Sequence, residues 1–295
     1  MKRNLYWIGI ALAIQVSAQQ STEKISRELN FEKAGANAVM IFNINGSVKV
    51  EGYSGSKVIV EVEKKIDAKT EARLALGKEE IQLGVMDRAD TLLLFVKGTC
   101  SPFGKLTDRE RWNRRVGSWG YDWNLRHTED CEKKYDYTMN FVVKVPSGVN
   151  VLASTVNRGD IEIQGVSGKV VADNINGSIQ LSGLSNTTQA STINGSVKLD
   201  FSGNPPGDSR FYSLNGDITA NFRTGLGAQL AFKSFNGELY SSVDEITPLP
   251  VQLEKTDRGG EGTRYRVSGN RYKIGQGGPL LDFETFNGDV FVKEK

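Results

Sequence analysis

Three Trp, one Tyr and several Arg residues fall within residues 101–134, a segment that interrupts the regular apolar pattern of the chain. Exposed Trp and Tyr rings can stack on sugar rings or bases, and Arg can bind a carboxylate, sulfate or phosphate through two hydrogen bonds. The alternative is a cap, in which the rings pack on the protein and the guanidinium groups stack on the rings. The residues predicted to bind a ligand or partner are Trp112, Trp119, Tyr121, Trp123, Arg111, Arg114 and Arg115.

Carboxylates form a second candidate for chemistry, because they recur at one position of a repeated motif. Asp217, Glu238 and Asp289 occupy this position, whereas two earlier copies have Ser178 and Ser196. A pair of carboxylates about 5 Å apart can hydrolyse a glycosidic bond. Regularly stacked strands give about the same separation without any catalytic purpose, so a solvated row of acids is the favoured interpretation.

Other kinds of chemistry lack their residues. The chain has one His, His127, so neither a His-based triad nor a His-rich metal site is available. The Gly-rich stretch at 259–262 has no Lys-Ser/Thr after it and does not match a phosphate-binding loop. A formal net charge of +2 gives no general case for a nucleic-acid partner. The sequence therefore predicts no catalytic residue, no metal and no cofactor.

The element that must position these residues is a short motif: an apolar residue, Asn-Gly, then Ser, Asp or Glu, then a second apolar residue. Six copies occur, and a seventh around Asn157 has one inserted residue. From Asn157 the steps to the next Asn are 19, 18, 21 and 21 residues, and the last is 51. A near-constant period of this size is typical of repeat architectures. The motif residues are Asn45, Asn157, Asn176, Asn194, Asn215, Asn236 and Asn287, with Gly46, Gly177, Gly195, Gly216, Gly237 and Gly288.

Asn-Gly between apolar runs first suggests a two-residue hairpin turn. In such a hairpin, however, Ile175 and Ile179 lie on opposite faces of the sheet, and every copy has the same mismatch. The alternative is a coil that turns at Asn-Gly and stacks each copy on the previous one as parallel strands about 4.8 Å apart. The Asn amides then form a hydrogen-bonded ladder. A sandwich built from hairpins remains the other possibility.

The predicted fold is therefore all-β: a single-stranded, right-handed parallel β-solenoid (β-helix) with about 18–21 residues per coil. Both apolar residues of each motif should lie in its interior. The small polar residue before the motif, such as Thr192 or Ser213, should bond the backbone of the corner. A short helix is expected within residues 67–80.

Residues 1–18 match a signal peptide, with Lys2 and Arg3 before an apolar stretch and cleavage after Ala18. Export is therefore predicted, to the periplasm, the cell surface or the medium. No membrane span is expected in the mature chain. Residues 19–295 are expected to form one domain with insertions at 101–134 and 241–278. In an exported chain, Cys100 and Cys131 predict one disulfide that closes the first insertion.

The serial Ile-Asn-Gly-Ser-Ile motifs, with the closing stretch from Gly277 to Val290, resemble the bacterial putative-adhesin family of β-strand-repeat domains. The resemblance covers roughly Phe31 to the C-terminus. It implies an exported parallel β-solenoid and a role in adhesion. It implies no catalytic residues, and the Trp-rich insertion departs from the plain pattern.

The sequence thus favours an exported, non-enzymatic scaffold, an adhesin-like binding module for a glycan or protein of the cell envelope. A polysaccharide lyase or hydrolase built on a β-helix is the alternative from another class. An envelope-stress protein that acts only through protein contacts is a third possibility. Turnover of uronic-acid polymers would separate the enzyme from the other two.

Overall fold

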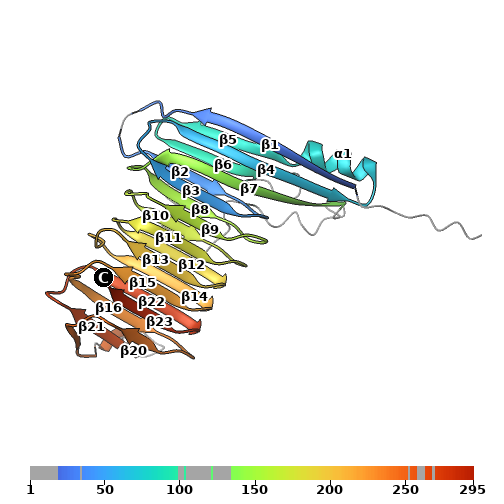
Figure 1. Cartoon of the computed structure of the whole chain (residues 1–295). Coiled ribbons are helices and arrows are strands. Elements are labelled where there is room, and N and C mark those ends of the chain that lie inside the picture. The colour runs from blue at the N-terminus through green and yellow to red at the C-terminus, as the bar shows by residue number, and fades with distance from the viewer. Residues whose placement is uncertain are drawn as a thin grey trace, which may run out of the picture.

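Alternating apolar and polar residues fold most of this chain into β-strands (Figure 1). The buried apolar side chains of these strands form one core. The computed structural model describes residues 19–33, 35–98, 103, 121, 134–251, 253–257, 263–267 and 270–295. The expected signal peptide, residues 1–18, lies outside these ranges. Within them the strands form two large sheets and one two-stranded sheet.

The first large sheet has ten strands, in the spatial order β1-β4-β7-β3-β9-β11-β13-β15-β23-β17. In that order, its strands are Gln19–Leu29, Val58–Ala68, Tyr135–Pro146, Val48–Tyr53, Ile161–Gln164, Ile179–Leu184, Val197–Phe201, Ile218–Phe222, Val290–Glu294 and Leu239–Ser241.

The second large sheet has eleven strands, in the order β18-β21-β16-β22-β14-β12-β10-β8-β2-β6-β5. In that order, its strands are Ile246–Pro248, Asn270–Ile274, Ala228–Lys233, Leu280–Asn287, Ser209–Asn215, Thr188–Asn194, Val170–Asp173, Asn150–Ser154, Ala38–Phe42, Thr91–Lys97 and Gln82–Arg88. The two-stranded sheet pairs β19 (Leu253–Asp257) with β20 (Thr263–Val267), and α1 is Glu71–Glu80.

In the centre of the molecule, the chain passes from the eleven-stranded to the ten-stranded sheet at each Asn-Gly motif. The pairs β8–β9, β10–β11, β12–β13 and β14–β15 are successive passes, and their strands pair in parallel with those of neighbouring passes. We call each such pass a layer. The motif is therefore a corner between the two sheets and not the turn of a hairpin.

The predicted single-stranded parallel β-solenoid is wrong for this chain, because both large sheets are mixed. At one end β4 pairs antiparallel with β1 and β7, and β5 pairs antiparallel with β6. At the other end β21 pairs antiparallel with β16 and β18. Strands β4 and β7 have 11 and 12 residues and no Asn-Gly corner. Long alternating strands of this kind pair in either direction, so their pattern does not determine a parallel coil.

The order of the layers also differs from their order in the sequence. The last layer, β22–β23, lies between β14–β15 and β16–β17. The first, β2–β3, lies between β6 and β8 in one sheet and between β7 and β9 in the other. The last step of 51 residues thus brings Asn287 back to a position between Asn215 and Asn236.

The corners are stabilised by the small polar residue that precedes each motif, as the sequence predicts. Thr192 and Ser213 are buried, and their hydroxyls donate to the carbonyl oxygens of Gly177 and Gly195 in the neighbouring layer, each at 2.8 Å. These bonds satisfy corner carbonyls that no strand reaches, and a buried carbonyl without a partner costs about 1–3 kcal/mol.

The second apolar residue of the motif is buried in most layers, for example Ile179, Val197 and Ile218. The first apolar residue of the motif is buried in one layer, as Ile44, but exposed in two others, as Phe235 and Phe286. The prediction that both apolar residues lie inside is therefore wrong. The corner turns the backbone, and the small polar residue takes the inward place. The first apolar residues of the later layers consequently form a file along the outside of the corner.

Candidate binding surface

The described part of the Trp- and Arg-rich segment is Tyr121 with Phe103, and it packs on the eleven-stranded sheet. Tyr121 is only 2% exposed. Its hydroxyl accepts a hydrogen bond from the Val96 amide at 2.9 Å and donates to the Phe42 carbonyl at 2.7 Å. Burial raises the pKa of this phenol well above its ordinary value. The Tyr121 side chain is therefore packed in the interior, beside β2 and β6. Trp112, Trp119, Trp123, Arg111, Arg114, Arg115, Cys100 and Cys131 lie outside the described residues.

The disulfide in the predicted fold has no support in the structure. No disulfide occurs among the residues that the structure describes, and both cysteines lie outside them.

The motif asparagines lie in one file along the corner. Each side-chain amide donates to the carbonyl oxygen of the next side chain, from Asn236 to Asn287 at 3.0 Å and from Asn287 to Asn215 at 2.9 Å. Three further bonds of 2.8–2.9 Å continue from Asn215 through Asn194 and Asn176 to Asn157. Asn45 pairs with Asn157 through the backbone. The file is directional, since every amide donates toward Asn157.

The carboxylates of the motif accept backbone hydrogen bonds between layers. Asp217 accepts from the Asp289 amide, and Asp289 accepts from the Glu238 amide, both at 2.9 Å. Asp160 likewise accepts from Ser178 at 2.7 Å. These carboxylates are tied to the backbone of the next layer. This bonding between layers explains why an acid recurs at this motif position without any catalytic role.

An exposed set of aromatic rings is the most distinctive feature of this corner. Phe235 is 73% exposed and stacks on Phe286, with ring centroids 4.8 Å apart and planes at 5°. Tyr240, 47% exposed, stacks on Phe291 at 5.1 Å and 12°. Phe235 and Phe286 occupy the first position of their motifs, and Tyr240 and Phe291 follow five residues later. We call these four residues the aromatic corner.

Aromatic residues occupy these positions only in the last two layers of the stack. The neighbouring layers have Ile175, Ile193 and Leu214 at the first position. They have Gln180, Lys198 and Thr219 five residues later. The rings therefore gather at one end of the molecule, around β17, the terminal strand of the ten-stranded sheet. Large exposed apolar groups clustered at one place are typical of a contact surface.

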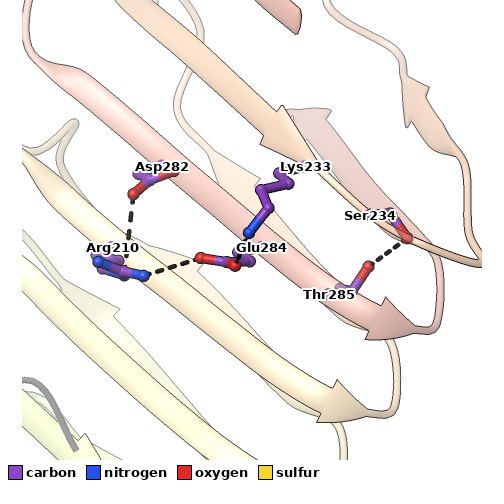
Figure 2. A network of polar contacts seen from close by, with 6 residues as sticks. All are labelled: Arg210, Lys233, Ser234, Asp282, Glu284 and Thr285. Atoms are coloured by element: carbon purple, nitrogen blue, oxygen red, sulfur yellow. Dashed lines mark hydrogen bonds and ion pairs between the residues drawn. The ribbon is translucent and has the colours of Figure 1, made fainter. Parts of the chain in front are cut away.

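Charged side chains border the aromatic corner on the eleven-stranded sheet. Figure 2 shows Arg210 paired with both Asp282 and Glu284, and Lys233 paired with Glu284. The Arg210 Nη2 atom lies 2.9 Å from Glu284 Oε2. Burial is the main cause that raises the pKa of Asp282. Beside this network, the Thr285 hydroxyl donates a hydrogen bond to the Ser234 hydroxyl at 2.9 Å. The network connects β14, β22 and β16, and so fixes β22, which carries Phe286, beside β16, which ends two residues before Phe235.

The sequence carries a signal for this site in the residue types of the last two layers. The first motif position is apolar in every copy, which predicts an interior place for Phe235 and Phe286 as well. The change from Ile or Leu to Phe, together with the later Tyr240 and Phe291, marks the two layers that differ from the others.

The described residues contain no cluster of three or more His, Cys, Asp or Glu side chains that could hold a metal ion. In the same part of the chain, no helix has both the length and the hydrophobicity needed to cross a bilayer. What the corner offers is ring faces and edges, amides and carboxylates, which suit binding.

No family model and no curated protein matches the chain. Among solved structures, it is similar to a putative cell adhesion protein from Clostridium sporogenes, with 11% identity, 93% of this chain and 100% of that chain covered, and a TM-score of 0.43. A putative adhesin from Bacteroides fragilis has 12% identity, coverage of 92% and 97%, and a TM-score of 0.34. A putative lipid binding protein from Parabacteroides distasonis has 10% identity, coverage of 94% and 96%, and a TM-score of 0.22. All three TM-scores are below 0.5, and no role passes from these proteins to this chain.

Asp173 lies on β10 in the eleven-stranded sheet and should make the stability of the protein depend on pH. It lies beside Ser154 and Ser191 in the ladder, and burial raises the pKa of its carboxyl to about 7. The unfolded chain ionises near the ordinary value of 3.8, so folding disfavours the charged form. The contribution of Asp173 to the free energy of unfolding therefore falls as the pH rises from about 4 to about 7, and it is constant at higher pH. Asp173→Asn should raise the free energy of unfolding at pH 8 by about 2 kcal/mol.

Urea unfolding from pH 4 to pH 8 checks this, and the gain of Asp173→Asn should shrink toward the acid end. Asp87→Asn removes one exposed carboxylate from β5 and serves as the control for net charge. An Asp173→Asn profile parallel to that of the wild type would show that Asp173 does not cause the dependence.

Proposed function

We propose that this chain is a non-enzymatic, adhesin-like binding module, exported to a bacterial cell envelope, that holds a glycan or protein partner at the aromatic corner. The observation that carries the proposal is the pair of exposed ring stacks, Phe235 on Phe286 and Tyr240 on Phe291. Export rests on the signal-peptide pattern of residues 1–18, and the bacterial setting rests on the family resemblance of the motifs.

Two physical properties support a binding role for this corner. Full burial of one large apolar side chain contributes about 1.5–3 kcal/mol, so four rings can supply much of a micromolar affinity. The rings are also held in place before binding, because each belongs to a strand or corner bonded to its neighbours. Asn236 donates its backbone amide to the Phe286 carbonyl at 2.8 Å, for example. Little conformational entropy is then lost when a partner binds.

Neither rival has comparable support. A lyase or hydrolase needs free acids and bases, whereas Asp217 and Asp289 accept backbone amides. A role in envelope stress through protein contacts uses the same surface and differs only in the partner. The segment with Trp119 and Arg114 stays a second predicted contact surface, to be tested beside the first.

The double variant Phe235→Ser/Tyr240→Ser tests the proposal, because both side chains are exposed and their loss should leave the fold intact. Binding to isolated cell-envelope fractions should fall by about tenfold or more. Tyr265→Ser is the matched control, since it removes a ring that is 57% exposed on β20, and it should bind like the wild type. Trp119→Ala/Arg114→Ala gives the contribution of the predicted loop.

Equal binding by the wild type and the double variant, with unchanged thermal unfolding, would remove the aromatic corner from the proposal. Incubation of the wild type with uronic-acid polymers provides a separate check. Clear formation of product there would replace the binding module with an enzyme.

A further inference from the structure

The ten-stranded sheet ends at β17, and among the described residues no strand pairs with the other side of β17. Val290 donates to the Glu238 carbonyl at 2.9 Å, and Ser242 donates to the Val292 carbonyl at 3.0 Å. In a parallel ladder, alternate residues bond to the same neighbour, so Glu238, Tyr240 and Ser242 face β23. Leu239 and Ser241 therefore direct their N–H and C=O groups away from β23. Such an edge is a template for one more strand.

The Asn file is incomplete at the same edge. Asn236 donates its side-chain amide to Asn287, at the start of the chain of bonds that runs to Asn157. Within the described residues, the Asn236 Oδ1 atom accepts no hydrogen bond, although every other carbonyl oxygen in this chain of bonds does. One further Asn stacked on Asn236 would supply the missing donor.

The row of carboxylates ends in the same way. Asp217 accepts the backbone amide of Asp289, and Asp289 accepts that of Glu238. Glu238 occupies the place that would receive the amide of another layer. One of its oxygens accepts the Tyr240 hydroxyl at 2.9 Å, and the other accepts nothing among the described residues.

The two ring stacks also stop at this layer. Phe235 covers Phe286, and Tyr240 covers Phe291, but the outer sides of Phe235 and Tyr240 are open, as their exposures of 73% and 47% indicate. Leu239, whose counterparts Ile218 and Val290 are fully buried, is only partly buried here. A further layer with rings at both positions and an apolar residue between them would continue both ring stacks. It would also continue the row of apolar residues that ends at Leu239.

The Gly file restricts what can stack on this edge. A Cβ atom added to Gly237 would come 2.0 Å from the Gly288 carbonyl oxygen, and one added to Gly288 would come 2.3 Å from that of Gly216. Each layer thus places the backbone of its Gly directly over the preceding carbonyl. A segment stacked on Gly237 by the same geometry needs Gly at that position.

Building on the proposed function, we propose that the β17 edge accepts an extended segment of a partner protein as a further parallel strand, with the pattern aromatic-Asn-Gly-any-apolar-aromatic. Backbone groups of the segment would pair with Leu239 and Ser241, its Asn would donate to Asn236, and its rings would cover Phe235 and Tyr240. A glycan can stack on the rings but has no repeating N–H and C=O groups to complete a ladder, so a strand fits the edge better.

The chain itself supplies a probe with this pattern. Residues 284–293, whose sequence is ETFNGDVFVK, form the layer that lies on β17 from the other side. A fluorescein-labelled peptide of this sequence should bind the full mature chain saturably in anisotropy titrations. The same peptide with the change Gly288→Ala should bind at least about tenfold more weakly, because its Cβ meets the Gly237 carbonyl.

Phe235→Ser/Tyr240→Ser should weaken binding of the unchanged peptide at least about tenfold, and Tyr265→Ser should bind like the wild type. Thermal unfolding confirms that each variant is folded. Absence of saturable binding, or equal affinity of the Gly288→Ala peptide, would overturn the inference.

The outcomes also separate this inference from the proposed function. If the peptide does not bind but the double variant loses binding to envelope fractions, the strand is wrong and the binding module remains. If the binding to those fractions survives protease digestion and is lost after periodate oxidation, the partner is a glycan and the strand is again wrong. If the double variant binds envelope fractions like the wild type, the proposed function fails on its own test.

Discussion

Replacing Gly216 with alanine should lower the free energy of unfolding by about 3–5 kcal/mol. Gly216 has a φ angle of +153°, which L-residues with a side chain rarely adopt. A Cβ atom there would also lie 2.2 Å from the carbonyl oxygen of Gly195 and 2.6 Å from its carbonyl carbon. Both atoms belong to the backbone of a neighbouring layer, so neither can move without displacing a strand. Chemical denaturation of the purified variant measures the loss.

Two matched variants separate the causes. Gly225 has a φ angle of +81° and open space around the added Cβ, so Gly225→Ala reports backbone strain alone and should cost about 1–2 kcal/mol. Gly195→Ala places a Cβ 2.2 Å from the Gly177 carbonyl oxygen at an ordinary φ, and so reports the close approach alone. If Gly216→Ala costs no more than Gly225→Ala, the layers are not packed backbone to backbone at this corner.

The corner itself could be predicted from the sequence, because its chemistry is local. Asn-Gly supplies a backbone conformation that few residues allow, and the preceding Thr or Ser supplies a donor. The observed bonds from Thr192 and Ser213 to Gly carbonyls confirm that part. The helix expected within residues 67–80 is confirmed as α1, which begins after Thr70, whose hydroxyl accepts the Arg73 amide.

The direction and order of the strands could not be predicted in this way. Alternation of apolar and polar residues in β4 buries one face whether its neighbours run parallel or antiparallel, and β1 and β7 run antiparallel to it. The return of β22 to a place between β14 and β16 depends on how well their side chains pack. Phe211 and Phe283, with ring centroids 4.9 Å apart, meet only because of that return. A repeat period contains no information about such an insertion.

The exposed position of the aromatic corner cannot be predicted from the sequence for a related reason. An apolar residue at a fixed motif position indicates a common environment, and burial is the usual one. At this corner the backbone turns, so Phe286 and Leu214 point along an outer edge while Thr285 and Ser213 take the inner position. The sequence records which residue types alternate, but only the turn angle decides which of two adjacent residues faces the core.

Lys64→Met should lower the free energy of unfolding by about 3 kcal/mol. Lys64 lies on β4 with only 2% of its side chain exposed, and its ammonium group is 2.8 Å from the Glu23 carboxylate on β1. The same group donates to the carbonyl oxygens of Lys78 and Ile81 at 3.2 and 3.1 Å, where α1 ends. One buried cation thus joins an edge strand and the C-terminal end of the helix to the sheet. Met has a similar length but no donor, so the Ile81 carbonyl loses this partner, while the Lys78 carbonyl keeps only the Gln82 side-chain amide at 2.7 Å.

Lys65→Met is the matched control from the next position. Its ammonium group is 3.9 Å from Asp67, and its side chain is 42% exposed, so its loss should cost less than about 1 kcal/mol. Hydrogen exchange adds a local measurement, because the amides of β1 and α1 should lose protection in Lys64→Met before those of β12 and β14. A Lys64→Met variant as stable as Lys65→Met would mean that water replaces the ammonium group at the helix end, and that the edge strand is held by its ladder to β4 alone.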